Sequence, residues 1–357
     1  MNNIHLLLIS ISIILCSSSK PYVDATTGAS YVAPKSKKVD QQKKYNIMFY
    51  NVENFFDTTD DPNTRDDEYT PKGKRYWSNG RMYDKNNRVG KVILNAGDWD
   101  VPVLVGLCEV ENETIGELLT KSSPLKDKNF GYIHQNSQDS RGIDVMLLYR
   151  KDYYTPITTS FFSVDVPNNP NFRSRDILYS KGLLGGDTMH IFVNHWPSKY
   201  GGTMRTIPLR KAAGYTLKKR TDSIMAADPM AKIIIMGDLN DAAHEESVSQ
   251  ALGAIRYCEN LPDNALVNLS WPHVDAGKGT YKYRGNWDVI DHIIVSKGVL
   301  EGKGLKTTEN GMQIKELDFL IEDDTRNTGK QPFRTYWGYT YHDGYSDHLP
   351  VILELKK

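Results

Sequence analysis

The sequence predicts a protein of the α/β class, because short apolar runs that suit buried strands alternate along the chain with segments of helical spacing. Its 357 residues, of which 39% are hydrophobic, can bury a large core without disulfides or bound metal. Polar residues gather at the ends of the apolar runs, as in a site built on top of a packed sheet. We therefore expect one large folded domain over residues 45–357.

Residues 1–19 have the features of an export signal. Leu6–Leu15 is an uncharged apolar run, too short to span a bilayer, and it is followed by Cys16 and three serines. The segment 20–44 is rich in Ser, Thr, Lys, Gln and Pro, cannot repay its ordering entropy by burial, and is expected to be a flexible tether. We expect an exported protein, either free (secreted or periplasmic) or anchored to a membrane as a lipoprotein through lipidated Cys16.

The expected strands follow the apolar runs in order. Tyr45–Tyr50 is rich in β-forming residues, and the later runs are nearly continuous, as in strands that are buried on both faces. These later runs are Val103–Leu107, Val145–Tyr149, His190–Val193 and Ile233–Met236.

Two segments between these runs have helical spacing. They are Arg88–Gly97 and Leu209–Ala227, and the second places its apolar residues roughly on one stripe, with Lys or Arg elsewhere. The Asp228-Pro229 pair should end this second helix. The polar stretches Asp57–Lys74 and Glu309–Tyr345 are rich in Gly or Asp and are expected to be long loops.

Charge and motif content weigh against several classes of protein. Lys and Arg number 44, as do Asp and Glu, so no global basic field draws the chain onto nucleic acid. The three cysteines cannot build a disulfide framework, and none lies in a CxxC zinc pattern. The sequence has neither a glycine-rich dinucleotide fingerprint nor a GxxxxGK[ST] phosphate loop, so a dehydrogenase or a nucleotide-driven motor is not expected.

Chemically competent side chains recur at the ends of the apolar runs. Taken singly, an acid in such a place is more often a helix cap or a turn residue, and a lone histidine is more often structural. Their number and order favour a catalytic site instead. The set comprises Asn51, Glu53, Glu109, Arg141, Asp144, Asn194, His195, Asp238, Asn240, Asp291, Asp347 and His348.

Six segments carry all of these residues except Arg141 and Asp144: YNVENFF, GLCEVEN, VNHWPSK, MGDLND, DHIIVS and YSDHLPV. In this order they resemble the motifs of the endonuclease/exonuclease/phosphatase family, over roughly Tyr45–Glu354, and GDLN and SDH are the most specific of them. The resemblance implies a four-layer sandwich, in which two mostly antiparallel or mixed β-sheets pack face to face with helices outside. It also implies a divalent cation at one end of the sandwich.

The resemblance further implies a role for each matching residue. Asn51 and Glu109 would hold the cation, expected to be Mg²⁺ with Mn²⁺ or Ca²⁺ as substitutes, because hard cations prefer carboxylate and amide oxygens. Asp238 would orient and deprotonate the attacking water, and Asn240 would hold that water or the scissile phosphate.

The charge that develops on the phosphate needs donors, and the resemblance implies two histidines for this role. His195 and His348 would stabilise the charge, and one of them would protonate the leaving oxygen. Asp347 would hydrogen-bond His348, fix its tautomer and keep it cationic. Asp291 would complete the acidic cluster as a metal ligand or a histidine partner, with a turn residue at a strand end as the alternative.

Several residues are candidates for phosphate binding. Arg141 and Lys199 offer charged donors, and Asn194 offers an amide next to the motif histidine. With Lys199, the nearby Arg205 and Arg210 form either a local phosphate-binding patch or a solvated helix face, and Arg141 is alternatively a plain surface residue.

Three further residues have roles that the sequence leaves open. Glu53 departs from the simplest family pattern, and Asp144 has no assigned role. Trp196 lies beside His195, where it either stacks on a base or sugar or belongs to the core.

The leading hypothesis is a monomeric, secreted, metal-dependent endonuclease or phosphodiesterase that acts on nucleic acid. The alternatives are a phospholipid hydrolase of the sphingomyelinase type, an inositol-phosphate phosphatase, and an inactive member that serves as a binding module. The shared motifs handle the phosphate, whereas the loops choose the rest of the substrate. The sequence therefore does not decide between DNA, RNA, lipid and inositol phosphate, or between one metal ion and two.

Overall fold

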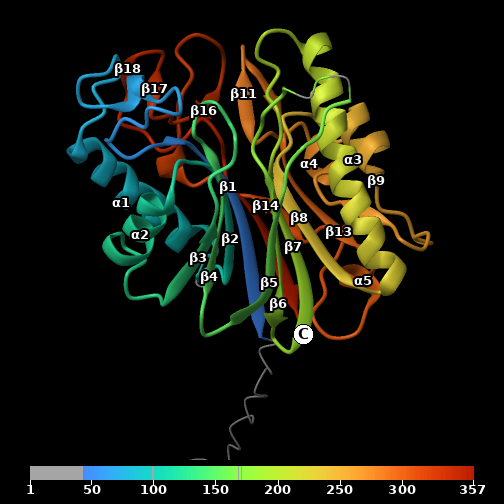
Figure 1. Ribbon diagram of the computed structural model, residues 1–357. Helices are drawn as coiled ribbons and strands as arrows, with labels where there is room; N and C mark the ends of the chain where they lie inside the picture. Colours follow the sequence, from blue (N-terminus) through green and yellow to red (C-terminus); the bar gives the residue numbers. More distant parts are fainter. Residues whose placement is uncertain (1–42, 99, 168, 170) are drawn as a thin grey trace, which may run out of the picture. The chain divides into compact units, whose positions relative to one another are not determined.

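Two β-sheets form the centre of the molecule, and helices cover the outer face of each sheet (Figure 1). The computed structural model describes residues 43–98, 100–167, 169 and 171–357. The predicted export signal, Cys16 and all but the last two residues of the predicted tether lie outside the described residues. Of those two, Lys44 is already the first residue of a strand.

The first sheet has six strands in the order β14-β19-β1-β2-β4-β3. Its central strand β1 pairs in parallel with β2 and antiparallel with β19, so the sheet is mixed. The strands are β1 (Lys44–Phe55), β2 (Leu104–Val110), β3 (Phe130–His134), β4 (Asp144–Arg150), β14 (Met312–Ile314) and β19 (Val351–Lys356).

The second sheet has seven strands in the order β5-β6-β7-β8-β13-β10-β9. Its centre repeats the pattern of the first sheet, because β8 pairs in parallel with β7 and antiparallel with β13. The strands are β5 (Tyr154–Phe162), β6 (Ile177–Leu184), β7 (Asp187–His195), β8 (Lys232–Asp238), β9 (Ala254–Ile255), β10 (Leu266–Asn268) and β13 (Asp291–Ser296).

The remaining elements of the described residues are helices and three two-stranded hairpins. The helices are α1 (Asn79–Ala96), α2 (Glu113–Ser122), α3 (Thr203–Ala227), α4 (Trp271–Asp275), α5 (Lys297–Glu301), the 3₁₀ turns η1 (Asp67–Tyr69) and η3 (Asp318–Leu320), and the π-helix η2 (Ser247–Leu252). The hairpins pair β11 (Tyr281–Tyr283) with β12 (Asn286–Asp288), β15 (Ile321–Asp323) with β16 (Lys330–Pro332), and β17 (Tyr336–Trp337) with β18 (Thr340–Tyr341). No helix among the described residues has the length and hydropathy that a membrane span requires.

Strand residues alternate between two apolar layers, which explains why the predicted runs are nearly continuous. In β1, Ile47 and Phe49 point into the core between the sheets, whereas Met48 and Tyr50 join the cluster beneath α1 and α2. A third cluster packs α3, through residues such as Leu217, against the outer face of the second sheet. The layers are therefore helix, sheet, sheet and helix, which confirms the predicted four-layer sandwich.

The structure extends some predicted elements and corrects others. The helix predicted from Arg88 begins at Asn79, because the Ser78 side chain accepts a hydrogen bond from the Arg81 N–H and caps it. The prediction that Glu309–Tyr345 is a long loop is wrong in part, since it contains β14 to β18 and η3. Strands of two or three residues are too short to show an alternating pattern in the sequence.

Candidate active site

Three of the predicted site residues lie side by side on adjacent strands of the second sheet. His195 ends β7 and pairs with Asp238 at the end of β8, and Asp238 pairs in turn with Asp291 at the start of β13. Parallel pairing aligns the ends of β7 and β8, and antiparallel pairing brings the start of β13 to the same edge. The register of the sheet therefore builds one row of polar side chains.

The first sheet contributes Asn51 and Glu109, each at a break in the pairing of its strand. The register of β1 and β2 shifts between Asn51 and Phe55, and that of β2 and β4 shifts between Cys108 and Val110. Glu109 has a positive φ of 62°, a backbone conformation that costs energy for a residue with a side chain. Bulges of this kind re-aim a side chain at the edge of a sheet.

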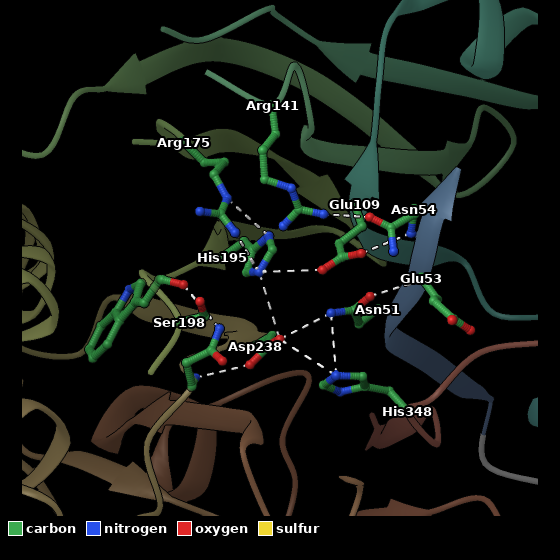
Figure 2. A network of polar contacts seen from close by, with 12 residues as sticks. Asn51, Glu53, Asn54, Glu109, Arg141, Arg175, His195, Ser198, Asp238 and His348 are labelled. Carbon is green, nitrogen blue, oxygen red and sulfur yellow. Dashed lines mark hydrogen bonds and ion pairs between the residues drawn. The ribbon is translucent and has the colours of Figure 1, made fainter. Parts of the chain in front are cut away.

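The Asp238 carboxylate is the centre of the cluster (Figure 2). Its Oδ2 accepts a hydrogen bond from Asn51 Nδ2 at 3.0 Å and lies 3.8 Å from Nε2 of both His195 and His348. Its Oδ1 accepts the backbone N–H of Asn240 at 2.9 Å. Burial and the charge of Asp291 raise the pKa of Asp238 to about 7, although the cationic His348 opposes them.

His348 has a carboxylate partner on the side away from Asp238. Its Nδ1 lies 2.7 Å from Asp291 Oδ2. Burial alone would lower the pKa of His348, but the charges of Asp291 and Asp238 outweigh it and raise the pKa to about 10. The prediction that Asp347 is this partner is wrong, because its carboxylate accepts a hydrogen bond from Arg334 at 2.6 Å.

His195 has an arginine partner instead. The Nε and Nη2 atoms of Arg175 lie 3.2 Å and 2.9 Å from its two ring nitrogens, and Glu109 Oε1 lies 3.9 Å from its Nε2. Burial and the charges of Arg175 and Arg141 hold the pKa of His195 well below its ordinary value. His195 is therefore neutral at the pH at which His348 is cationic.

The carboxylates of Asp238, Asp291 and Glu109 suit a hard divalent cation. Two groups of side chains each place their possible ligand atoms within 4.8 Å of one another. The first is Cys108, His195 and Asp238, and the second is Asp238, Asp291 and His348. Asp291 Oδ1 is buried without a hydrogen-bond partner among the described residues. The Glu109 carboxylate faces the same pocket, while its other oxygen, Oε2, accepts the N–H of Asn54. Carboxylate and amide oxygens of this kind are ligands that Mg²⁺ and Ca²⁺ prefer.

The cluster lines a pocket of about 540 Å³. Both sheets contribute to its walls, together with the loop before α3 and the β11–β12 hairpin. The side chains that line it include Glu109, Arg141, Arg175, His195, Lys199, Tyr200, Asp238, Asn240, Tyr283 and His348.

Comparison with known proteins agrees with this arrangement. The model of the Endonuclease/Exonuclease/phosphatase family matches residues 46–357. The chain belongs to this family.

Solved structures share the fold of this family member at low sequence identity. A family protein from Bacteroides thetaiotaomicron is 14% identical over 88% of this chain and 95% of its own, with a TM-score of 0.53. A mannosyl-6-phosphatase from the same organism is 14% identical over 87% and 99%, with a TM-score of 0.52. D. rerio TDP2 in complex with a single-strand DNA product is 13% identical over 88% and 99%, with a TM-score of 0.52. No curated protein matches the sequence.

The predicted phosphate-binding residues differ in where the structure places them. Arg141 and Lys199 line the pocket, although Lys199 is also 3.3 Å from Asp241 and 3.7 Å from Glu245. Asn194 does not reach the pocket. Its buried amide donates to the Met236 carbonyl and accepts a hydrogen bond from Trp196, so the prediction that it binds phosphate is corrected.

The patch of Lys199, Arg205 and Arg210, like its alternative of a solvated helix face, is corrected at Arg210. Arg205 is exposed, but Arg210 is fully buried and its Nε lies 2.6 Å from Asp241 Oδ2. Trp196 is likewise buried, in the cluster beneath α3, and belongs to the core rather than to a stacking surface.

The two acids with open roles have structural partners. Glu53 accepts hydrogen bonds from the backbone N–H groups of Thr335 and Tyr336, and so holds the loop that follows β16. Asp144 accepts the N–H of Ser137 and fixes the turn before β4.

Sequence reasoning missed Arg175, Asp139 and the pocket tyrosines. Asp139 precedes the predicted Arg141 by two residues and lies 3.4 Å from the Arg175 guanidinium. Arg175 lies two residues before the run Ile177–Tyr179, in a part of the chain where the sequence shows no motif.

Proposed function

We propose that this chain is a Mg²⁺-dependent phosphodiesterase whose substrate is nucleic acid, exported from the cell and active as a monomer. The observation that carries the proposal is that Asn51, His195 and His348 converge on the Asp238 carboxylate, while Glu109 lies 3.9 Å from His195 and lines the same pocket as Asp238.

Each of these side chains has a task that its environment supports. Asn51 and Glu109 would hold the cation, which when bound neutralises charge on a phosphate oxygen and polarises phosphorus. Asp238, with a pKa near 7, is matched to removing a proton from water at neutral pH. The backbone N–H of Asn240 holds the Asp238 carboxylate in place by donating a hydrogen bond to its Oδ1.

The two histidines complete the chemistry in different protonation states. Cationic His348 can stabilise negative charge on the phosphate and donate a proton to the leaving oxygen. Neutral His195 can donate one hydrogen bond and accept another, so it orients groups without adding charge.

Aromatic side chains at the pocket favour a nucleic acid over the other substrates. Tyr200 is 91% exposed and Tyr283 is 55% exposed, and they come from different elements that line the same pocket as Asp238. Exposed aromatic rings offer surfaces on which bases stack, and stacking contributes about 1–3 kcal/mol per base. A lipid or inositol-phosphate substrate would use the same phosphate chemistry without needing these rings.

An activity panel on purified protein tests the proposal. Chelator-treated enzyme is given Mg²⁺, Mn²⁺, Ca²⁺ or Zn²⁺, with bis(p-nitrophenyl) phosphate, plasmid DNA, RNA, sphingomyelin and inositol phosphates as substrates. Cleavage of the diester and of nucleic acid with Mg²⁺ supports the proposal. Preference for lipid or inositol phosphates, full turnover after exhaustive chelation, or restoration by Zn²⁺ alone contradicts it, and Asp238→Asn protein controls for contaminating nucleases.

Export is tested separately on protein from its native source. We expect mass spectrometry of the mature chain to lack residues 1–19. A diacyl-modified Cys16 would select the lipoprotein form, and an intact Met1 in a cytoplasmic fraction would refute export.

A further inference from the structure

Arg175 lies on the loop between β5 and β6, is 8% exposed and lines the catalytic pocket. Its guanidinium contacts both ring nitrogens of His195 and, through Nη1, the Asp139 carboxylate. Figure 2 shows it beside Arg141, above the imidazole of His195.

These contacts do not use the full donor capacity of the guanidinium. An arginine has five N–H donors, and the contacts with His195 and Asp139 involve three of them. An imidazole ring accepts at most one hydrogen bond in either of its common protonation states, so the two N–H groups that face His195 cannot both be satisfied by it. At least three of the five donors therefore have no acceptor among the described residues.

The charge of Arg175 is likewise only partly compensated. Its ion pair with Asp139 is long, at 3.4 Å, and the other oxygen of Asp139 accepts the backbone N–H of Arg141. Burying a cation is costly unless it is closely paired and fully hydrogen-bonded. A bound anion would supply the missing partner.

A second arginine, Arg141, lies beside Arg175, and Asp139 contacts both. Arg141 also lines the pocket, and its Nη2 donates to Asn54 Oδ1. Asp139 thus holds the Arg141 backbone with one oxygen and the Arg175 side chain with the other. The two arginines come from loops of different sheets, yet one carboxylate fixes them beside each other.

We propose that Arg175 is a catalytic residue that binds a non-bridging oxygen of the scissile phosphate, together with Arg141, and that Asp139 is the residue that positions it. This inference rests on the proposed function. Guanidinium groups match the geometry of phosphate oxygens, and a donor fixed before the reaction stabilises the charge that develops on them.

The test measures turnover and anion binding on the same variants. Arg175→Ala, Arg175→Lys and Asp139→Asn are compared with Arg256→Ala, a matched control that breaks an exposed arginine–aspartate pair with Asp275. Turnover is measured on bis(p-nitrophenyl) phosphate with Mg²⁺. Binding of inorganic phosphate is measured by calorimetry with and without Mg²⁺, and thermal unfolding checks that each variant is folded.

We expect Arg175→Ala to lower kcat/KM by roughly 100–1,000-fold and to weaken phosphate binding by roughly 10–100-fold. Arg175→Lys should bind phosphate more tightly than Arg175→Ala but less tightly than the wild type, because lysine keeps the positive charge but lacks the planar pair of guanidinium donors. Asp139→Asn should have a smaller effect, and it should add little to Arg175→Ala in the double variant, as residues acting through one another do.

Phosphate binding separates this inference from the proposed function, because it needs no turnover. If the wild-type protein hydrolyses no phosphodiester, the proposed function fails, whereas a selective loss of phosphate binding in Arg175→Ala still supports the anion site. Unchanged phosphate affinity in Arg175→Ala overturns the inference even if turnover falls, since Arg175 would then only orient His195. Absence of phosphate binding by the wild-type protein overturns it as well.

Discussion

His348 and His195 lie on opposite sides of Asp238, each with Nε2 3.8 Å from the same carboxylate oxygen, but their other neighbours differ. Asp291 faces His348, and the pKa of His348 rises to about 10. Arg175 faces His195, and the pKa of His195 falls well below its ordinary value. Burial lowers the pKa of both rings, but the charges of Asp291 and Asp238 outweigh it at His348, whereas the charges of Arg175 and Arg141 add to it at His195.

The opposite pKa shifts of His348 and His195 also make the stability of the fold depend on pH in opposite ways. A histidine with a raised pKa stabilises the fold below its unfolded value of about 6.5, and this contribution is lost as the pH rises toward 10. A histidine with a lowered pKa destabilises the fold as the pH falls below about 6.5, because the unfolded chain then binds the proton more tightly. The His195 side is therefore sensitive to acid and the His348 side to alkali.

The largest effect on turnover is expected at Asp238, which both histidines share. Asp238→Asn should lower kcat by roughly 100–10,000-fold, because the base that activates water is lost while the shape of the side chain is kept. Steady-state kinetics and thermal unfolding are recorded on the same samples. Turnover above about a third of the wild-type value would remove Asp238 from the mechanism, and a collapse in melting temperature would make its role structural.

Asp291→Asn tests the His348 side. Loss of the carboxylate that keeps His348 cationic should lower kcat by roughly 100–1,000-fold, the cost of one charge-stabilising donor. Breaking this buried pair should also cost about 3–5 kcal/mol of unfolding free energy near pH 7.

The pH dependence of stability isolates this pair. Between pH 6.5 and pH 10 the wild-type protein should lose stability relative to Asp291→Asn, because only the wild type releases the tightly held His348 proton. Urea unfolding in the presence of chelator measures both proteins. A constant difference between them across this range would show that Asp291 does not hold the proton on His348.

Glu109→Gln tests the predicted metal ligand on the His195 side. We expect metal affinity to fall at least roughly 10–100-fold, a loss that even residues behind the ligands produce. Calorimetric titration with Mn²⁺ measures the affinity, and excess Mg²⁺ should restore part of the turnover. Glu53→Gln is the matched control, since its carboxylate serves the loop at Thr335 rather than the pocket. Equal Mn²⁺ affinity in Glu109→Gln and the wild type would contradict the assignment.

The sequence predicted the fold well because the signals of a buried strand are local. Continuous apolar runs mark strands with a core on each side, and β1 shows this directly, since its residues alternate between two clusters. The hairpins β15–β16 and β17–β18 were missed, because pairing over two or three residues leaves no periodicity to detect.

The sequence predicted the site residues that lie at strand ends, but not the partners that they contact. His195 and Asp238 follow closely after predicted runs, Asp291 opens the DHIIVS motif, and the sheet register then places the three together. The partners were not predictable from neighbouring positions. Asp347 precedes His348 directly, but Asp347 lies at a bend and meets Arg334, while His348 forms a β-bridge with Tyr281 and meets Asp291.

The smallest effect on turnover is expected at Arg210, which the sequence grouped with a phosphate-binding patch. Arg210→Met breaks the buried pair with Asp241 and should cost up to about 3–5 kcal/mol of stability, because the buried carboxylate loses its nearest cation and keeps only the longer contact with Lys199 at 3.3 Å. Turnover of the folded protein, measured well below its melting temperature, should change less than about threefold, since Arg210 does not line the pocket. The exposed Arg205→Met on the same helix is the control and should change neither quantity. A tenfold rise in KM for Arg210→Met with unchanged stability would show that Arg210 belongs to the substrate-binding surface. Charged residues outside the surroundings of His195 and His348 would then also contribute to substrate binding.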